Sequence, residues 1–68
     1  MTTRTYSVPA ISCDHCRRAI EGEVSKLAGV DLVQVDVQRK EVRVEGDVTD
    51  AAVRGAIDEA GYEVEAVL

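Results

Sequence analysis

The sequence repeats a short motif at the end of each of two helix-like segments. Leu27–Leu32 reads LAGVDL and Glu59–Val64 reads EAGYEV, so the two copies lie 32 positions apart. In each copy a glycine follows an amphipathic segment, and glycine readily adopts the positive φ that commonly ends a helix. A strand-like segment comes directly after each glycine. The repeat therefore predicts two halves of similar structure, in which a helix leads into a strand.

Each helix-like segment carries one apolar stripe. The first runs from about Cys13 or Asp14 to Ala28, and the second runs to Ala60 with Thr49 as N-cap and Gly61 as the stop. At about 100° per residue, the apolar side chains of the first segment fall within about 140° of arc. The stripes consist of Cys16, Ala19, Ile20, Val24 and Leu27 in the first segment and Ala52, Val53, Ala56, Ile57 and Ala60 in the second.

Four other segments alternate apolar and polar residues, as half-buried strands do. The predicted strands are Thr3–Val8, Asp31–Gln38, Glu41–Glu45 and Tyr62–Leu68. The second and third are joined by a hairpin turn at Arg39–Lys40. The side chains expected to face the core are Tyr6, Val8, Val33, Val35, Val37, Val42, Val44 and Val64.

The resulting order, βαββαβ, predicts an α+β, ferredoxin-like fold over residues 1–68 as one domain. Its four-stranded antiparallel sheet would carry both helices on one face. The other face would be polar, with Thr5, Ser7, Gln34, Asp36, Arg43 and Glu45. Because aromatic residues make up only 3% of the chain, that face lacks the base-stacking platform by which this fold binds RNA.

Charge and hydropathy exclude several classes of function. The 13 acidic and 8 basic residues give a net charge of −5, which disfavours nucleic acids and anionic membrane surfaces as partners. No apolar run approaches the roughly 20 residues of a membrane span. The start, Met1–Tyr6, lacks the apolar segment of a signal peptide. We therefore expect a cytoplasmic protein that does not insert into membranes.

The chemistry of the chain lies in Cys13-Asp14-His15-Cys16, where the first strand meets the first helix. A disulfide across this spacing would close almost no loop and stabilise little. The helix N-terminus favours thiolate over thiol, and a soft cation relieves the repulsion between two thiolates. Cu(I) and Zn(II) are both candidates. Zn(II) normally takes four ligands, whereas two sulfurs satisfy Cu(I), so the ligand count favours Cu(I).

The segment Ala10–Cys16 (AISCDHC), followed by a helix and later by Ala60–Val64 (AGYEV), resembles the heavy-metal-associated domain and, within it, bacterial copper chaperones of the CopZ type. The resemblance extends from Tyr6 to about Val67. It implies that Cys13 and Cys16 bind Cu(I) and that the ion passes to a copper-transporting P-type ATPase. Ala10 and Ile11 replace the Gly and Met usual in the family, where the Met is a packing residue.

Other residues near the motif receive supporting roles. Ser12, His15 and Tyr62 are candidates for contacts around the metal, and the resemblance places Tyr62 at the loop tyrosine near the metal in bacterial members. We expect His15 to face solvent and tune the site rather than bind the ion. Arg17 and Arg18 are candidates for docking an acidic partner or for offsetting the −1 charge of a Cu(I) bis-thiolate.

The sequence thus predicts a Cu(I) carrier without catalytic turnover, monomeric without metal and able to form a metal-bridged dimer. Alternatives are the N-terminal metal-binding domain of a transport ATPase, a carrier of Hg(II), Zn(II) or Cd(II), and a Zn(II) site shared between two chains. A thiol–disulfide oxidoreductase is the alternative from another class, because Cys-x-x-Cys is its working motif. Against it, no Trp or Pro flanks the cysteine pair.

Overall fold

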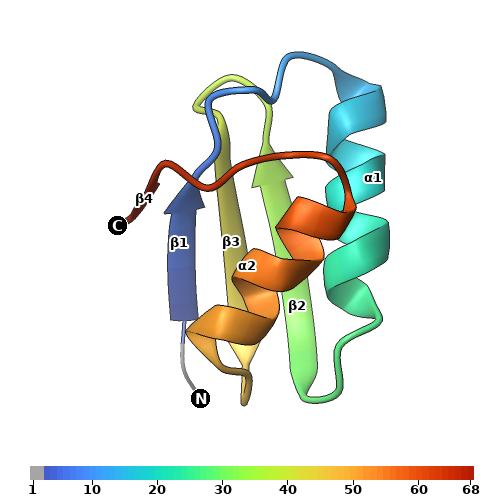
Figure 1. Cartoon of the computed structure of the whole chain (residues 1–68), viewed down its shortest axis with the longest axis vertical. Coiled ribbons are helices and arrows are strands. Elements are labelled where there is room, and N and C mark those ends of the chain that lie inside the picture. The colour runs from blue at the N-terminus through green and yellow to red at the C-terminus, as the bar shows by residue number, and fades with distance from the viewer. Residues whose placement is uncertain (1–2) are drawn as a thin grey trace.

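The structure is a computed structural model that describes residues 3–68. Its elements follow the predicted order of strands and helices (Figure 1). They are β1 (Thr3–Ser7), α1 (Asp14–Ser25), β2 (Val30–Asp36), β3 (Glu41–Gly46), α2 (Asp50–Glu59) and β4 (Ala66–Val67).

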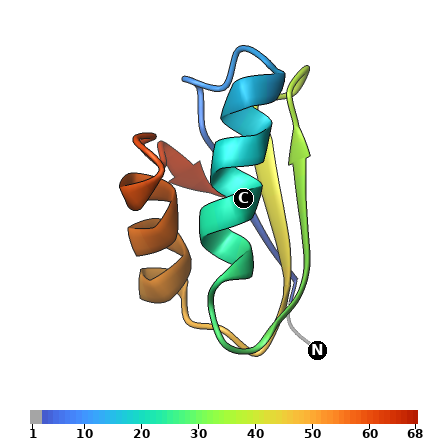
Figure 2. The same cartoon turned by 90° about the vertical axis from the view of Figure 1, so that its right-hand side faces the viewer.

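The four strands form one antiparallel sheet in the order β2-β3-β1-β4. Seen from the side, both helices lie on the same face of the sheet (Figure 2). This arrangement confirms the predicted ferredoxin-like fold. No helix within residues 3–68 is long and apolar enough to cross a membrane.

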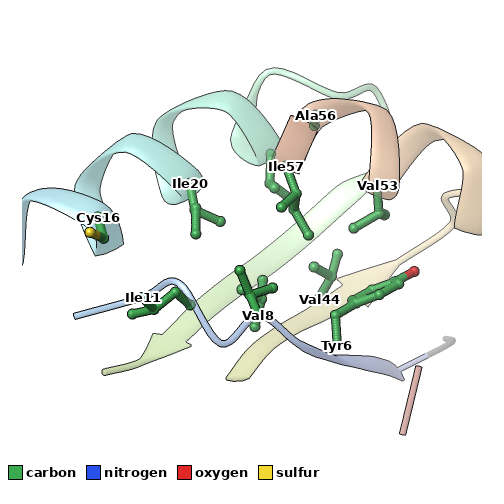
Figure 3. Close-up of a cluster of buried hydrophobic side chains, with 11 residues drawn as sticks. Tyr6, Val8, Ile11, Cys16, Ile20, Val44, Val53, Ala56 and Ile57 are labelled. Carbon is green, nitrogen blue, oxygen red and sulfur yellow. The ribbon is translucent and has the colours of Figure 1, made fainter. Parts of the chain in front are cut away.

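The core lies between the sheet and the two helices, as the apolar stripes predict (Figure 3). Each fully buried aliphatic side chain contributes about 1.5–3 kcal/mol relative to an exposed one. The predicted core residues of β2 are only half-buried, because β2 is an edge strand with a partner on one side. The buried set is Tyr6, Val8, Ile11, Cys16, Ile20, Val24, Val42, Val44, Val53, Ala56 and Ile57.

The first helix is shorter than predicted. It ends at Ser25, whereas the periodicity of the sequence extends it to Ala28. The N–H of Leu27 bonds to the carbonyl of Val24 three residues before it, at 3.1 Å. This spacing is that of a 3₁₀ turn, which is tighter than an α-helical turn. Gly29 then turns the chain at a φ of 93°, the positive value predicted for it. The helix end is therefore set by local hydrogen bonds and not by the length of the apolar stripe.

The last strand is also shorter than predicted. The alternation of the sequence predicts Tyr62–Leu68, but only Ala66–Val67 pair with β1. The N–H of Tyr62 still bonds to the carbonyl of Ile57, 3.1 Å away, at the end of α2. From there the chain crosses the end of the sheet to reach the outer edge of β1 (Figure 1). Val64 packs against the core from this crossing segment and not from a strand.

The turn between β2 and β3 begins earlier than the predicted Arg39–Lys40 pair. β2 ends at Asp36, and the Asp36 carboxylate accepts a 3.0 Å hydrogen bond from the N–H of Arg39. This bond closes a side-chain turn that competes with strand pairing. Lys40 completes the turn in the left-handed region, at a φ of 57°.

Candidate metal site

The two cysteines lie where the loop after β1 enters α1. Cys13 is the N-cap residue, in an extended conformation, and its side chain makes no capping hydrogen bond. Cys16 follows in the first turn of the helix, as predicted. Ahead of them, Ile11 is fully buried and its N–H bonds to the carbonyl of Val8 at 3.1 Å. The cysteine loop thus starts from a residue anchored in the core.

The sulfur atoms of Cys13 and Cys16 are 3.6 Å apart, and both residues are free thiols. Their environments differ. Cys13 is exposed, whereas Cys16 is 7% exposed and belongs to the core cluster, at the end remote from Tyr6 in Figure 3. The pair therefore combines a sulfur held by packing with a sulfur that solvent and other molecules can reach.

Several hydrogen bonds stabilise the ionised form of Cys16. They lower the pKa of its thiol from the ordinary 9.0 to about 6. The largest contribution comes from the Tyr62 hydroxyl, followed by the backbone of Ser12, while burial acts in the opposite direction. The position near the N-terminus of α1 also favours the anion. The surroundings of Cys16 therefore favour its thiolate over its thiol.

The structure brings two of the three supporting residues against Cys16. Tyr62 approaches it from the segment after α2, and its interaction with Cys16 raises the pKa of the Tyr62 hydroxyl. The Ser12 hydroxyl lies 4.0 Å from the Cys16 sulfur. His15 is exposed. Within residues 3–68, no group of three or more His, Cys, Asp or Glu side chains is arranged to hold a metal ion.

The two arginines after the motif share one carboxylate. Arg17 Nε lies 2.8 Å from Asp14 Oδ1, and its Nη1 lies 3.2 Å from Glu21 Oε1. Arg18 Nε is 3.6 Å from Asp14 Oδ2, and its side chain is 75% exposed against 34% for Arg17. The hydrogen bond from Arg17 lowers the pKa of Asp14. Arg17 is thus engaged within the helix, whereas most of Arg18 faces solvent.

Sequence reasoning missed Lys40, which it treated only as part of a polar turn. The Lys40 ammonium donates a 2.7 Å hydrogen bond to the Ile11 carbonyl, two residues before Cys13. No local pattern signals this contact, because it joins residues 29 positions apart. It depends on how the β2–β3 turn is placed beside the cysteine loop.

Comparison with known protein families matches residues 5–63 to the heavy-metal-associated domain. This chain belongs to that family. In this heavy-metal-associated domain, Ile11 occupies the position of the usual Met and is completely buried. It therefore serves the packing function that the resemblance predicts for that position.

Relatives with curated names agree with this assignment. The chain is 39% identical to the copper chaperone CopZ of Staphylococcus haemolyticus over 67 residues, which cover 94% of this chain and 98% of that protein. The solution structure of apo-CopP from Helicobacter pylori is 38% identical and has a TM-score of 0.84, covering 93% of this chain and 98% of that one.

A third heavy-metal-associated domain resembles the chain in fold alone. It is the copper-binding domain of HMA7, a P-type ATPase, with a TM-score of 0.91 at 24% identity. The match covers 100% of this chain and 95% of that domain. The fold therefore also occurs in a copper-binding domain of a P-type ATPase.

Proposed function

We propose that this chain is a cytoplasmic Cu(I) carrier that binds the ion through the thiolates of Cys13 and Cys16. One observation carries the proposal, namely two thiol sulfurs 3.6 Å apart at a helix N-terminus. The lowered pKa of Cys16 supports it, because the surroundings that lower it favour the thiolate, the form that binds a metal. The copper chaperones among its relatives support the same cargo.

The donor set favours Cu(I) over Zn(II). Two thiolates held this close repel each other, and a monovalent cation between them leaves a net charge of −1. Thiolate sulfur is a soft ligand that suits Cu(I). A structural Zn(II) site would use four ligands. Zn(II), Cd(II) and Hg(II) remain the competing cargoes against which the preference is to be measured.

Release of the ion uses the difference between the two sulfurs. A partner thiolate reaches the ion from the exposed side, at Cys13, and adds to it to give a three-coordinate intermediate. Cys13 and then Cys16 dissociate as a second partner thiolate binds, so each bond broken is replaced by one formed. Cys16 keeps the ion in place until then, because its side chain is packed in the core.

The proposed acceptor is the metal-binding domain of a copper-transporting P-type ATPase. The occurrence of the same fold in a copper-binding domain of a P-type ATPase supports an acceptor of this kind. Arg18, the more exposed of the two arginines near the site, is the better candidate for contact with an acidic partner. The carrier is monomeric without metal, and a second copy could supply the additional thiolates in a metal-bridged dimer.

Titration of the reduced protein with Cu(I) against a chromogenic chelator tests the proposal. We expect tight binding of one equivalent, which is lost in Cys13→Ser and in Cys16→Ser. His15→Ala is the matched control within the motif and should bind as the wild type does. Tight binding that survives either cysteine substitution contradicts the proposed ligands. Competition with Zn(II), Cd(II) and Hg(II), followed by native mass spectrometry, identifies the preferred ion and the oligomeric state.

A second function is favoured by the same pair of sulfurs. A thiol–disulfide oxidoreductase also needs two close thiols, one of them with a lowered pKa. Insulin reduction by dithiothreitol in the presence of the protein separates the two functions. A Cu(I) carrier leaves the rate unchanged. Acceleration that disappears in Cys13→Ser would favour the oxidoreductase.

A further inference from the structure

Lys40 adopts a backbone conformation that is unusual for its residue type. Its φ of 57° makes it the only residue other than glycine with a positive φ within residues 3–68. Gly usually occupies this region because it has no Cβ to crowd the following carbonyl, and Asn and Asp tolerate it because their short polar side chains bond locally to the backbone. In other residues such a conformation persists where surrounding contacts hold it, and these residues cluster at functional sites.

Those contacts lead to the cysteine loop. The carbonyl of Lys40 accepts a 2.8 Å hydrogen bond from the N–H of Val8, and its ammonium donates a 2.7 Å bond to the carbonyl of Ile11. Val8 and Ile11 are in turn joined by the 3.1 Å bond that closes the turn between them. One residue of the β2–β3 turn therefore holds both ends of the turn that precedes Cys13.

The cysteines differ in how they depend on this turn. Cys16 is fixed by the helix and by the core. Cys13 is exposed and its side chain caps nothing, so its position follows from the path of the chain after Ile11. Ile11 has no exposed surface, and the ammonium of Lys40 is the long-range partner of its carbonyl. Loss of that ammonium would leave the carbonyl without this donor and loosen the path to Cys13.

We propose that Lys40 is a positioning residue of the metal site. By holding Val8 and Ile11 it sets where Cys13 lies relative to Cys16, and this pre-arranged separation strengthens Cu(I) binding. The inference rests on the proposed function, in which these two cysteines hold the ion. It adds a residue from a separate hairpin that contacts neither sulfur.

The substitution Lys40→Gly distinguishes a positioning role of Lys40 from a structural one. Lys40→Gly relieves the left-handed backbone and keeps the carbonyl bond to Val8, but it removes the ammonium. We expect an unchanged or higher melting temperature together with about tenfold weaker Cu(I) binding, equivalent to about 1.4 kcal/mol. Lys40→Asn also tolerates this backbone and should behave alike. Lys40→Arg retains a cationic donor and should restore binding to within about threefold of the wild type.

Arg39→Ala is the matched control, because it removes one positive charge from the same turn while leaving the contacts of Lys40 intact. It should bind Cu(I) as the wild type does. Wild-type affinity in Lys40→Gly, or an equal loss in Arg39→Ala, would overturn the proposal.

Amide hydrogen exchange of the metal-free protein tests the contact between Lys40 and Ile11 independently of copper. In Lys40→Gly the Ile11 amide should exchange faster relative to that of Val44 in the core. Unchanged exchange at Ile11 would also overturn the proposal. If the wild type binds no Cu(I), the proposed function fails, while this comparison still decides whether Lys40 holds the loop.

Discussion

The hydroxyl of Tyr62 and the sulfur of Cys16 shift each other's ionisation. Their mutual interaction is the largest cause both of the lowered pKa of Cys16 and of the raised pKa of Tyr62. The two residues come from opposite halves of the repeat, Cys16 from the start of the first helix and Tyr62 from just after the second. The segment after α2 therefore belongs to the site as fully as the cysteine loop does.

Removal of the Tyr62 hydroxyl should make Cys16 a weaker acid. In Tyr62→Phe the ring remains but the donor is lost, so the pKa of Cys16 should rise from about 6 towards its ordinary 9.0. Thiolate absorbance near 240 nm, followed against pH in a Cys13→Ser background, measures the shift. Ser7→Ala, on the open face of the sheet, is a control that should leave the curve unchanged. An unchanged curve in Tyr62→Phe would show that the hydroxyl does not stabilise the thiolate.

The same lowered pKa makes the stability of the reduced, metal-free protein depend on pH. Cys16 has a pKa of about 6 when folded and an ordinary value of 9.0, so the unfolded chain binds more protons between these values. The contribution of the thiolate is fully present above about pH 9 and is lost as the pH falls towards 6. Urea unfolding at several pH values should show stability declining over this window. Cys16→Ser should flatten this decline. An equal slope of the free energy of unfolding against pH in both proteins would contradict the contribution of the Cys16 thiolate.

Tyr6 should make the stability of the protein depend on pH in the alkaline range. Burial, assisted by the negative charge of Asp50, raises the pKa of its hydroxyl to about 12. Since the unfolded tyrosine ionises near 10, the free energy of unfolding should fall as the pH rises from about 10 to 12. Absorbance at 295 nm in Tyr62→Phe isolates the titration of Tyr6. A midpoint near 10 in the folded protein would contradict the effect of burial, and Tyr6→Phe should remove the titration altogether.

Local periodicity was sufficient to predict the order of the elements and most of the core. Ile20, Val24, Val53 and Ile57 are buried where their spacing places them, because a helix has only one face to bury. The length of β4 could not be predicted in this way. Alternation continues through the crossing segment, while pairing begins only where that segment reaches β1.

In the candidate site, too, some features follow from the local sequence and others depend on three-dimensional packing. The positions of Cys13 and Cys16 follow from their place at a helix start, which is a local property. The contact of Lys40 with Ile11 depends on the packing of a hairpin against a loop, and no sequence spacing encodes it. Sequence patterns thus indicated the proposed ligands, whereas three-dimensional packing was needed to find the residue that we propose positions them.

The backbones of Gly29 and Asp47 lie close together at the other end of the molecule. The Gly29 carbonyl accepts a 2.9 Å hydrogen bond from the N–H of Asp47, and a Cβ on Gly29 would collide with the Asp47 carbonyl. The φ of 93° is itself unfavourable for other residues. We therefore expect Gly29→Ala to lower the free energy of unfolding by about 2 kcal/mol or more. Chemical denaturation of the two proteins measures the difference.

Gly55 supplies the matched control for this substitution. It lies inside α2, and a Cβ there would meet nothing within 4 Å. Gly55→Ala should therefore raise stability by about 0.5–1 kcal/mol, because alanine favours the helix and has less backbone freedom to lose. Effects of opposite sign at the two glycines would show that contact and conformation at Gly29, and not the added methyl group as such, cause the loss. A stable Gly29→Ala would mean that the two turns do not approach as closely as the structure has them.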